Sequence, residues 1–198
     1  MIIDATSSVA RRDLVFGGLA ALVSTGVAQD AVAQQRRALR VPVRLTEMMV
    51  RDTRAGRQLR LIRDIMSQRV VALTFFFTGC STVCPIQSMA LSRAQPLLQP
   101  LLGPRAVFVS ISLDWFGDTP KAIESFAQAH HAGPHWRFLK APLGAVDNLR
   151  RGFESYDPQR DNHPPVIAIG RAGAPNWSRL YGNPRPTDIA TEVRAWAA

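Results

Sequence analysis

The sequence lacks several features that would indicate a function class at once. It shows no internal repeat and no low-complexity tract. Its apolar stretch from Leu14 to Ala28 covers 15 residues (28 − 14 + 1), which is short of the roughly 20 that a helix needs to span a bilayer. No basic run is interleaved with aromatic residues, which argues against a nucleic-acid partner. The 198 residues, 46% hydrophobic and 20% charged, predict a folded soluble domain instead of a disordered chain.

Lysine is scarce as well, because Lys121 and Lys140 are the only two in the chain. The net charge of +9 is therefore carried almost wholly by arginine. Such arginine usage is typical of a GC-rich coding sequence. The functional alternative is a basic face for an acidic partner or an anionic membrane surface.

The first residues have the pattern of an export signal. Arg11-Arg12 is a twin-arginine pair, the apolar stretch follows it, and small-x-Ala sequences end at Ala28 and Ala33. We predict a twin-arginine-type export signal over residues 1–33, cleaved after Ala33, and hence a periplasmic location. The alternative is an uncleaved N-terminus that tethers the protein to the inner membrane. Cleavage would leave a net charge of +10, from 22 basic (24 − 2) and 12 acidic (15 − 3) residues.

The remaining chain predicts a flexible segment at 34–42 and one domain at 43–198. Strands alternate with helices along this domain, which indicates an α/β fold with a central mixed sheet flanked by helices. Alternating segments around turn residues predict an N-terminal β-hairpin. The expected hairpin strands are 41–45 and 58–62, the core strands 70–77, 106–113, 136–139, 165–170 and 177–181, and the helices 85–95, 120–127, 143–153 and a last one from Pro186.

The only two cysteines, Cys80 and Cys84, lie between a buried strand and a helix that begins at Pro85. Such a pair can exchange electrons as a dithiol or bind a thiophilic metal. A spacing of four residues on a helix separates the two Cβ atoms by about 5–6 Å, which is wide for a disulfide. The helix N-terminus favours the thiolate that both chemistries require. A plain structural disulfide is the third possibility.

A metal site needs a further ligand, and the chain has four histidines. His130, His131 and His135 lie at the end of a predicted helix and in the loop after it, where exposed histidines interact favourably with the helix dipole. His163 precedes Pro164-Pro165 and a core strand. In a thioredoxin-like arrangement this loop faces the cysteine pair, so His163 is the candidate third ligand. Asp114 ends the strand beside the cysteine strand, where it could orient a ligand or interact with a helix N-terminus.

Several segments resemble the Sco/SenC family of copper chaperones. They are Cys80-Ser81-Thr82-Val83-Cys84-Pro85, similar to the family's Cys-x-x-x-Cys-Pro motif, Ser112 to Pro120, similar to Ser-Val-Asp-Pro-x-x-Asp-Thr-Pro, Trp136-Arg137-Phe138-Leu139, and Asn162-His163. The likeness runs from about residue 43 to the C-terminus. The chain departs from the family at Gly79, where members often have His, and at Ser81-Thr82, where they have Pro-Asp.

The resemblance implies a thioredoxin-like fold that binds copper through Cys80, Cys84 and His163, with Asp114 near these ligands. It also implies a monomer that delivers copper to the binuclear copper site of cytochrome c oxidase, in a partner such as subunit II, or keeps the thiols of that site reduced. Two thiolates favour Cu(I), and one imidazole completes a three-coordinate site that can pass its ion on.

Two enzymatic alternatives remain open. In the first, Cys80 and Cys84 are the catalytic pair of a periplasmic thiol:disulfide oxidoreductase, and His163 only modulates their pKa values. Pro165, near where thioredoxins keep a cis-proline, supports this reading. A thioredoxin-superfamily peroxidase ranks last, because no peroxidatic Cys pattern is present in the sequence.

Overall fold

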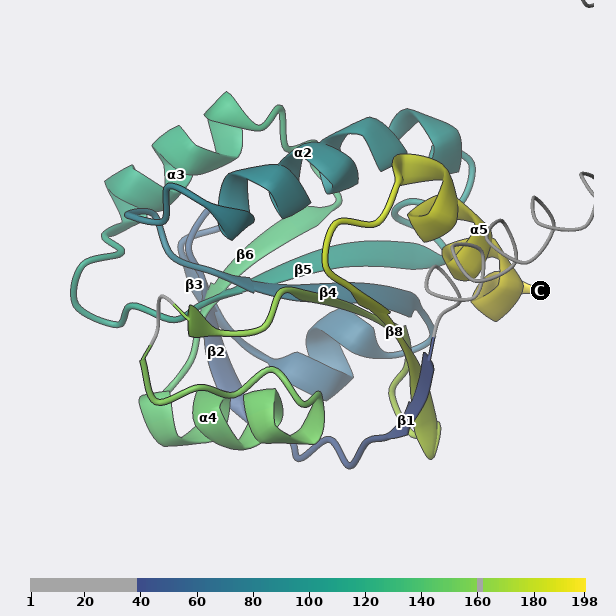
Figure 1. Ribbon diagram of the computed structural model, residues 1–198, viewed down its shortest axis with the longest axis horizontal. Helices are drawn as coiled ribbons and strands as arrows, with labels where there is room; N and C mark the ends of the chain where they lie inside the picture. The colour runs from purple at the N-terminus through teal and green to yellow at the C-terminus, as the bar shows by residue number, and fades with distance from the viewer. Residues whose placement is uncertain (1–38, 160–161) are drawn as a thin grey trace, which may run out of the picture. The chain divides into compact units, whose positions relative to one another are not determined.

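A computed structural model describes residues 39–159 and 162–198, so the predicted export signal lies outside the described residues. The described chain forms an eight-stranded sheet in the order β1-β8-β7-β4-β5-β6-β2-β3 (Figure 1). The strands are β1 (Leu39–Pro42), β2 (Met49–Asp52), β3 (Arg57–Arg60), β4 (Val70–Phe76), β5 (Ala106–Ser112), β6 (Trp136–Lys140), β7 (Val166–Arg171) and β8 (Asn176–Tyr181). The helices are α2 (Val83–Ala94), α3 (Pro120–Ala129), α4 (Leu143–Gly152) and α5 (Pro186–Ala197), with a π-helix η1 (Leu61–Met66) and a 3-10 turn η2 (Pro96–Leu98).

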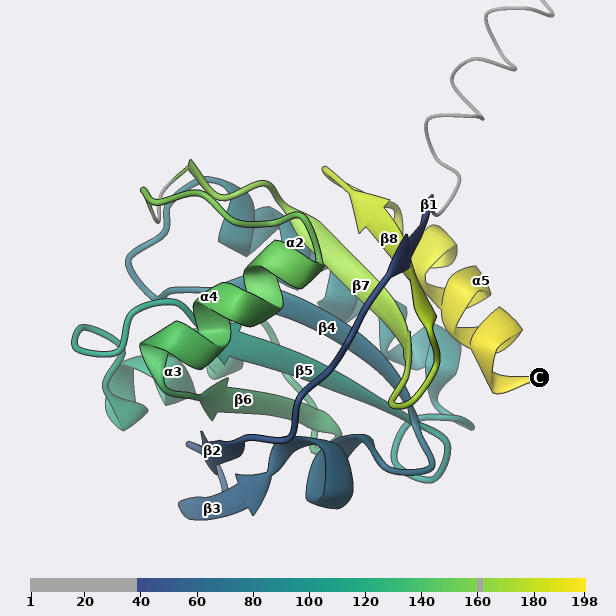
Figure 2. The same cartoon turned by 90° about the horizontal axis from the view of Figure 1, so that it is seen from below.

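The sheet is mixed, as predicted. β4, β5 and β6 are parallel neighbours, whereas β7 is antiparallel to β4 and β8 is antiparallel to β7. Helices α2, α3 and α5 cover one face of the sheet and α4 covers the other (Figures 1 and 2). All seven residues of β4 are buried, as expected for a central strand with helices on both sides. The C-terminal end of β4, where the cysteines follow, is therefore a junction between the sheet and the helical layer.

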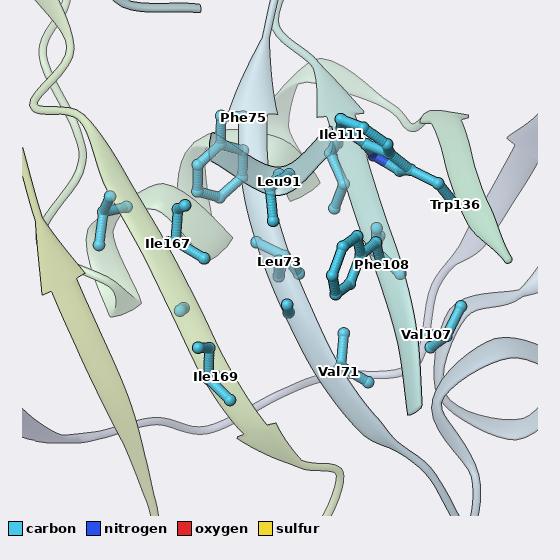
Figure 3. Close-up of a cluster of buried hydrophobic side chains, with 14 of the residues drawn as sticks. Val71, Leu73, Phe75, Leu91, Val107, Phe108, Ile111, Trp136, Ile167 and Ile169 are labelled. Atoms are coloured by element: carbon cyan, nitrogen blue, oxygen red, sulfur yellow. The ribbon is translucent and has the colours of Figure 1, made fainter. Parts of the chain in front are cut away.

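Aromatic side chains fill the space between the sheet and the helices. On the face of α3, Phe76 packs edge-on against Phe138 with ring centroids 5.3 Å apart, and against Phe126 of α3 at 5.1 Å. On the face of α4, Trp177 lies over Gly170, where a Cβ atom would collide with the indole. Figure 3 shows part of this buried core, with Leu73 and Phe75 of β4 and Leu91 of α2 among the labelled side chains. This packing anchors the strands whose ends carry the candidate site.

The predicted N-terminal hairpin exists, but its first strand was assigned to the wrong residues. The segment predicted at 41–45 lies at the opposite edge of the sheet, where β1 pairs with β8 and buries Val41. The hairpin consists of β2 and β3, because Val50 and Asp52 are the residues buried there. Asp52 also accepts a hydrogen bond from the main-chain N–H of Ala55 at 2.9 Å, which closes the turn. Strand β1 begins inside the segment 34–42 that the sequence predicts to be flexible.

The returning strand of the hairpin is also shorter than predicted. It ends at Arg60, and η1 occupies the residues from Leu61 onward. Leu61, Ile65 and Met66 are buried in this short helix. Their helical spacing determines the local structure, although the alternation around Leu59 predicts a strand. By contrast, the predicted start of α3 is confirmed, because the Thr119 hydroxyl accepts a hydrogen bond from the main-chain N–H of Ala122.

Candidate metal and thiol site

The two cysteines lie at the C-terminal end of β4, where the chain turns into α2. Cys80 is in the connecting loop and Cys84 is the second residue of α2. Both are free thiols and both are buried, with 9% of Cys80 and 1% of Cys84 exposed. The main-chain N–H of Cys84 donates a hydrogen bond to Sγ of Cys80 at 3.4 Å. The structure therefore brings together the two sulfur atoms that the sequence analysis singled out.

The N-terminus of α2 is directed at the sulfur of Cys80. Thr82 is the N-cap residue, but its side chain makes no capping hydrogen bond to the helix; its hydroxyl lies 3.9 Å from Sγ of Cys80. The Cys80 sulfur instead accepts a main-chain N–H of the first turn, the role that a capping oxygen usually has. A thiolate at this position is stabilised by the positive end of the helix dipole.

The environment separates the two pKa values. Burial alone would raise the pKa of Cys80, but hydrogen bonds from Cys84 and Thr82 outweigh it and lower that pKa. Burial, the hydrogen bond with Cys80 and the negative charges of Cys80 and Asp118 raise the pKa of Cys84 far above its ordinary value. Cys80 is therefore the sulfur that ionises first, while Cys84 still keeps its proton.

Asp118 supports the cysteine loop, a role that the sequence analysis missed. Its side chain is 1% exposed. One carboxylate oxygen accepts the main-chain N–H of Thr78 at 2.7 Å and the Thr78 hydroxyl at 2.6 Å. The other accepts the Ser112 hydroxyl at 2.6 Å. Asp118 thus fastens the loop before Cys80 to the end of β5. In the sequence, Asp118 belongs to the Asp-Thr-Pro segment that resembles the family motif, but nothing in that segment indicates a partner 40 residues away.

Asp114, the predicted neighbour of the ligands, has a local role. Its Oδ1 accepts hydrogen bonds from the main-chain N–H groups of Phe116 at 3.2 Å and Gly117 at 2.8 Å. Any side chain at Gly117 would collide with this carboxylate. These contacts use Asp114 to form the turn after β5, so its part in orienting a copper ligand stays a prediction.

His163 lies at the same end of the sheet as the cysteines. It stands three residues before β7 (166 − 163), and Cys80 stands four residues after β4 (80 − 76). Because β4 and β7 are antiparallel neighbours, the end of one strand lies beside the start of the other. The His163 side chain is 3% exposed. Among the described residues, however, no group of three or more His, Cys, Asp or Glu side chains is close enough together to hold a metal ion.

The other histidines lie elsewhere. His131 and His135 are exposed, as expected near a helix C-terminus. His130 is half-buried instead, with its ring centroid 4.4 Å from that of Phe126 in a tilted arrangement, and burial lowers its pKa. The peptide bond before Pro165 is trans, as are all those of the described residues, so the cis-proline expected of a thioredoxin is not found there.

The fold and the dithiol at its strand-to-helix junction define a thioredoxin-like domain. The family model described as SCO1/SenC matches residues 60–154. This match supports the SCO1/SenC resemblance that the sequence motifs indicate. No curated protein matches the sequence.

Solved structures of the family share this fold. A SCO1/SenC family lipoprotein from Bacillus anthracis is 20% identical, with a TM-score of 0.64, and the match covers 82% of this chain and 99% of the lipoprotein. BsSco, described as a member of the Sco family of cytochrome c oxidase assembly proteins, is 18% identical over 79% of this chain and 94% of its own, with a TM-score of 0.64. ScoI of Bradyrhizobium japonicum with copper bound is 16% identical over 79% and 99%, with a TM-score of 0.61.

The predicted thioredoxin-like fold is therefore confirmed. A further finding concerns the membrane: within residues 39–159 and 162–198, no helix is both long and apolar enough to cross one.

Proposed function

We propose that this protein binds copper and delivers it to a copper-accepting partner. The observation that carries the proposal is the pair of buried free thiols at the N-terminus of α2 in a chain that the SCO1/SenC family model matches. Thiolate sulfur is a soft ligand and selects Cu(I) over the harder ions of the cell. Two relatives of the same fold, ScoI of Bradyrhizobium japonicum and yeast Sco1, have structures with copper bound, which supports the same cargo here.

We propose Cys80, Cys84 and His163 as the three ligands. Cys80 would bind first, because its lowered pKa makes it the readier thiolate. Binding of the ion would then displace the proton of Cys84. Since the three side chains are not gathered into a metal-binding group in the described residues, we expect the segment before β7 to move toward the cysteines when copper is bound. If His163 joins the site only through such a movement, the reverse movement can release the ion to an acceptor.

We further propose that the acceptor is the binuclear copper site of cytochrome c oxidase, such as that of subunit II. The description of BsSco as belonging to the Sco family of cytochrome c oxidase assembly proteins supports this assignment. Transfer would take place in the periplasm, after export by the twin-arginine-type signal at residues 1–33. Keeping the thiols of the same copper site reduced is the related role that Cys80 and Cys84 could perform.

The test of copper binding is a Cu(I) titration of the reduced protein against a strong chelator. His163→Ala should weaken binding at least about tenfold, the loss expected for one ligand contact. His135→Ala removes an exposed histidine and is the matched control. Unchanged affinity in His163→Ala, together with rapid dithiol exchange on model disulfides, would favour the thiol:disulfide oxidoreductase, which the comparisons do not favour.

The test of export is mass spectrometry of the protein recovered from the periplasm. Cleavage after Ala33 gives a mature chain that begins at Gln34. An intact Met1 in that fraction would exclude cleavage and leave the membrane-tethered form.

A further inference from the structure

A second feature lies at the other end of the sheet from the cysteines. A cavity of about 540 Å³ is lined by residues that include Arg63, Arg69 and Arg171. Arg69 immediately precedes β4 and Arg171 is the last residue of β7. Because β4 runs for seven residues from here to the cysteine loop, the cavity is about 20 Å away from the thiols. It belongs to no part of the copper site.

Two of the arginines are held in position by neutral acceptors. Arg171 donates from Nε to the carbonyl of Trp196 at 3.0 Å and from Nη1 to the carbonyl of Gln68 at 3.3 Å. Arg69 donates from Nη2 to the carbonyl of Asp64 at 3.2 Å. Main-chain carbonyls fix the direction of a guanidinium without cancelling its charge. Both guanidinium groups keep further N–H donors for another acceptor.

The acidic side chains near the cavity are already engaged. Glu47 accepts the main-chain N–H groups of Ile62 at 2.8 Å and Arg63 at 3.1 Å. Asp64 pairs with Arg60 at 3.1 Å. Across the described residues, no carboxylate forms an ion pair with Arg63, Arg69 or Arg171. The lining thus carries three cationic side chains against the single carboxylate of Glu47.

Arg69 also lies near a further positive charge, that of Arg137. Burial and the neighbouring charge of Arg137 both lower the pKa of Arg69. An anion bound in the cavity would relieve this repulsion. Ser67 and Gln68, which line the cavity and are exposed, offer neutral hydrogen-bond donors beside the guanidinium groups.

We propose that this cavity binds a phosphate group. The planar N–H fork of arginine matches the oxygens of phosphate two at a time, and a tetrahedral dianion can accept from several guanidinium groups at once. An apolar ligand would leave the three charges without a partner, and a cation would be repelled. The phosphate can come from inorganic phosphate or from the headgroup of an anionic phospholipid, since the recognised chemistry is the same.

The experiment titrates the full chain with inorganic phosphate at constant ionic strength and follows the arginine Nε–Hε resonances by NMR. Constant ionic strength removes the general screening effect on a basic protein. Arg69 and Arg171 signals should shift and saturate. The double variant Arg69→Gln/Arg171→Gln should weaken binding at least about tenfold. Arg63→Gln should weaken binding as well. Because the Arg63 side chain forms no hydrogen bond or ion pair with the other described residues, this variant guards against misfolding of the double variant.

Arg57→Gln is the matched control, because it removes the same charge from an exposed position on β3 that does not line the cavity. A second arm measures sedimentation with phosphatidylglycerol vesicles and with phosphatidylcholine vesicles. Phosphatidylglycerol binding that is lost in the cavity variants but kept in Arg57→Gln identifies a lipid source, whereas saturation by inorganic phosphate without that difference identifies free phosphate. The proposal is overturned if the cavity variants and Arg57→Gln behave alike in both arms.

Discussion

Two neighbouring loops leave the sheet at the same end, and they are stabilised in different ways. The loop at 113–119, between β5 and α3, is closed by its own side chains: Asp114 accepts the N–H groups of its turn and Thr119 caps α3. In the described structure the loop at 77–82, between β4 and α2, has no hydroxyl cap, because Thr82 does not cap its helix; the sulfur of Cys80 accepts the N–H of Cys84. This loop is fastened by Asp118 of the neighbouring loop instead.

This difference in support allows the cysteine loop to be held in place without using the groups that act on the sulfur of Cys80. Thr119 accepts the N–H of the third residue of α3, but the third residue of α2 is Pro85, which has no N–H. A hydroxyl cap on α2 would therefore have to take the N–H of Cys84, which now points at the sulfur of Cys80. Because Asp118 supports the cysteine loop, the N-terminus of α2 remains available to stabilise a thiolate at Cys80. The sulfur is thereby both reactive and fixed in place. Each prediction below alters one side of this comparison.

The largest effect is expected from Asp118→Ala. The change leaves the Thr78 N–H, the Thr78 hydroxyl and the Ser112 hydroxyl without their buried acceptor. Each unsatisfied buried group costs about 1–3 kcal/mol, so we expect a loss of about 3 kcal/mol or more in the free energy of unfolding. Urea denaturation of the reduced protein measures this loss.

Two variants serve as controls for Asp118→Ala. Asp118→Asn keeps an acceptor oxygen and should lose less stability than the alanine variant. Asp114→Ala removes a carboxylate that accepts main-chain N–H groups of its own half-exposed turn, and should cost about 1 kcal/mol. Equal losses for Asp114→Ala and Asp118→Ala would contradict the view that one loop supports the other.

The second prediction concerns the reactivity of the two thiols. Cys80 has the lowered pKa and Cys84 the raised one, and only the thiolate is alkylated. At pH 7 we expect Cys80 to react with iodoacetamide at least about tenfold faster than Cys84, since one pKa unit changes the thiolate fraction tenfold. The rate at Cys80 should rise with pH and level off below the pKa of an ordinary thiol, about 8.5. Mass spectrometry of Cys80→Ser and Cys84→Ser assigns the rates, and comparable rates would reject the assignment.

The third prediction concerns the side-chain cap of α3, for which α2 has no equivalent. Thr119→Ala deletes the hydroxyl that accepts the Ala122 N–H and should lower the free energy of unfolding by about 1 kcal/mol, the usual loss for an N-cap. Because Asp118 precedes Thr119 directly, fraying of α3 should also loosen the cysteine loop. Hydrogen exchange at the Thr78 N–H measures this coupling. Unchanged exchange at Thr78 would show that Asp118 holds the loop independently of the cap.

The sequence signals that succeeded are local ones. The apolar runs of β4 and β5 predicted buried strands, and Thr119-Pro120 predicted the start of α3, because both depend on neighbouring residues alone. The role of Asp118 depends on a partner in another loop, which spacing along the chain cannot reveal. The hairpin strand at 41–45 was misassigned for a similar reason: an alternating segment does not specify which edge of a sheet it joins.

The residues of the candidate site also differ in how far local sequence signals could predict their positions. The strand-to-helix junction was sufficient to predict that Cys80 and Cys84 lie close together. The helical spacing assumed for them is wrong, because Cys80 lies in the loop before α2. His163 was placed through the antiparallel pairing of β4 and β7, which brings it to the same end of the sheet without gathering it into a metal-binding group. Its part as a ligand therefore depends on the copper titration.

The smallest effect on stability is expected from Thr82→Ala. Thr82 occupies the N-cap position of α2 but makes no side-chain capping bond, so its hydroxyl contributes little to the helix, and we expect a change within about 0.5 kcal/mol. The same hydroxyl lies 3.9 Å from the sulfur of Cys80 and helps to lower its pKa. Thr82→Ala should therefore raise the pKa of Cys80 slightly and shift its alkylation profile to higher pH. Thr119→Ala is the natural partner of this measurement, since it should cost more stability and shift the pH profile of Cys80 alkylation less than Thr82→Ala. A stability loss in Thr82→Ala as large as that in Thr119→Ala would mean that both helices are capped alike, and the contrast between the two loops would fail.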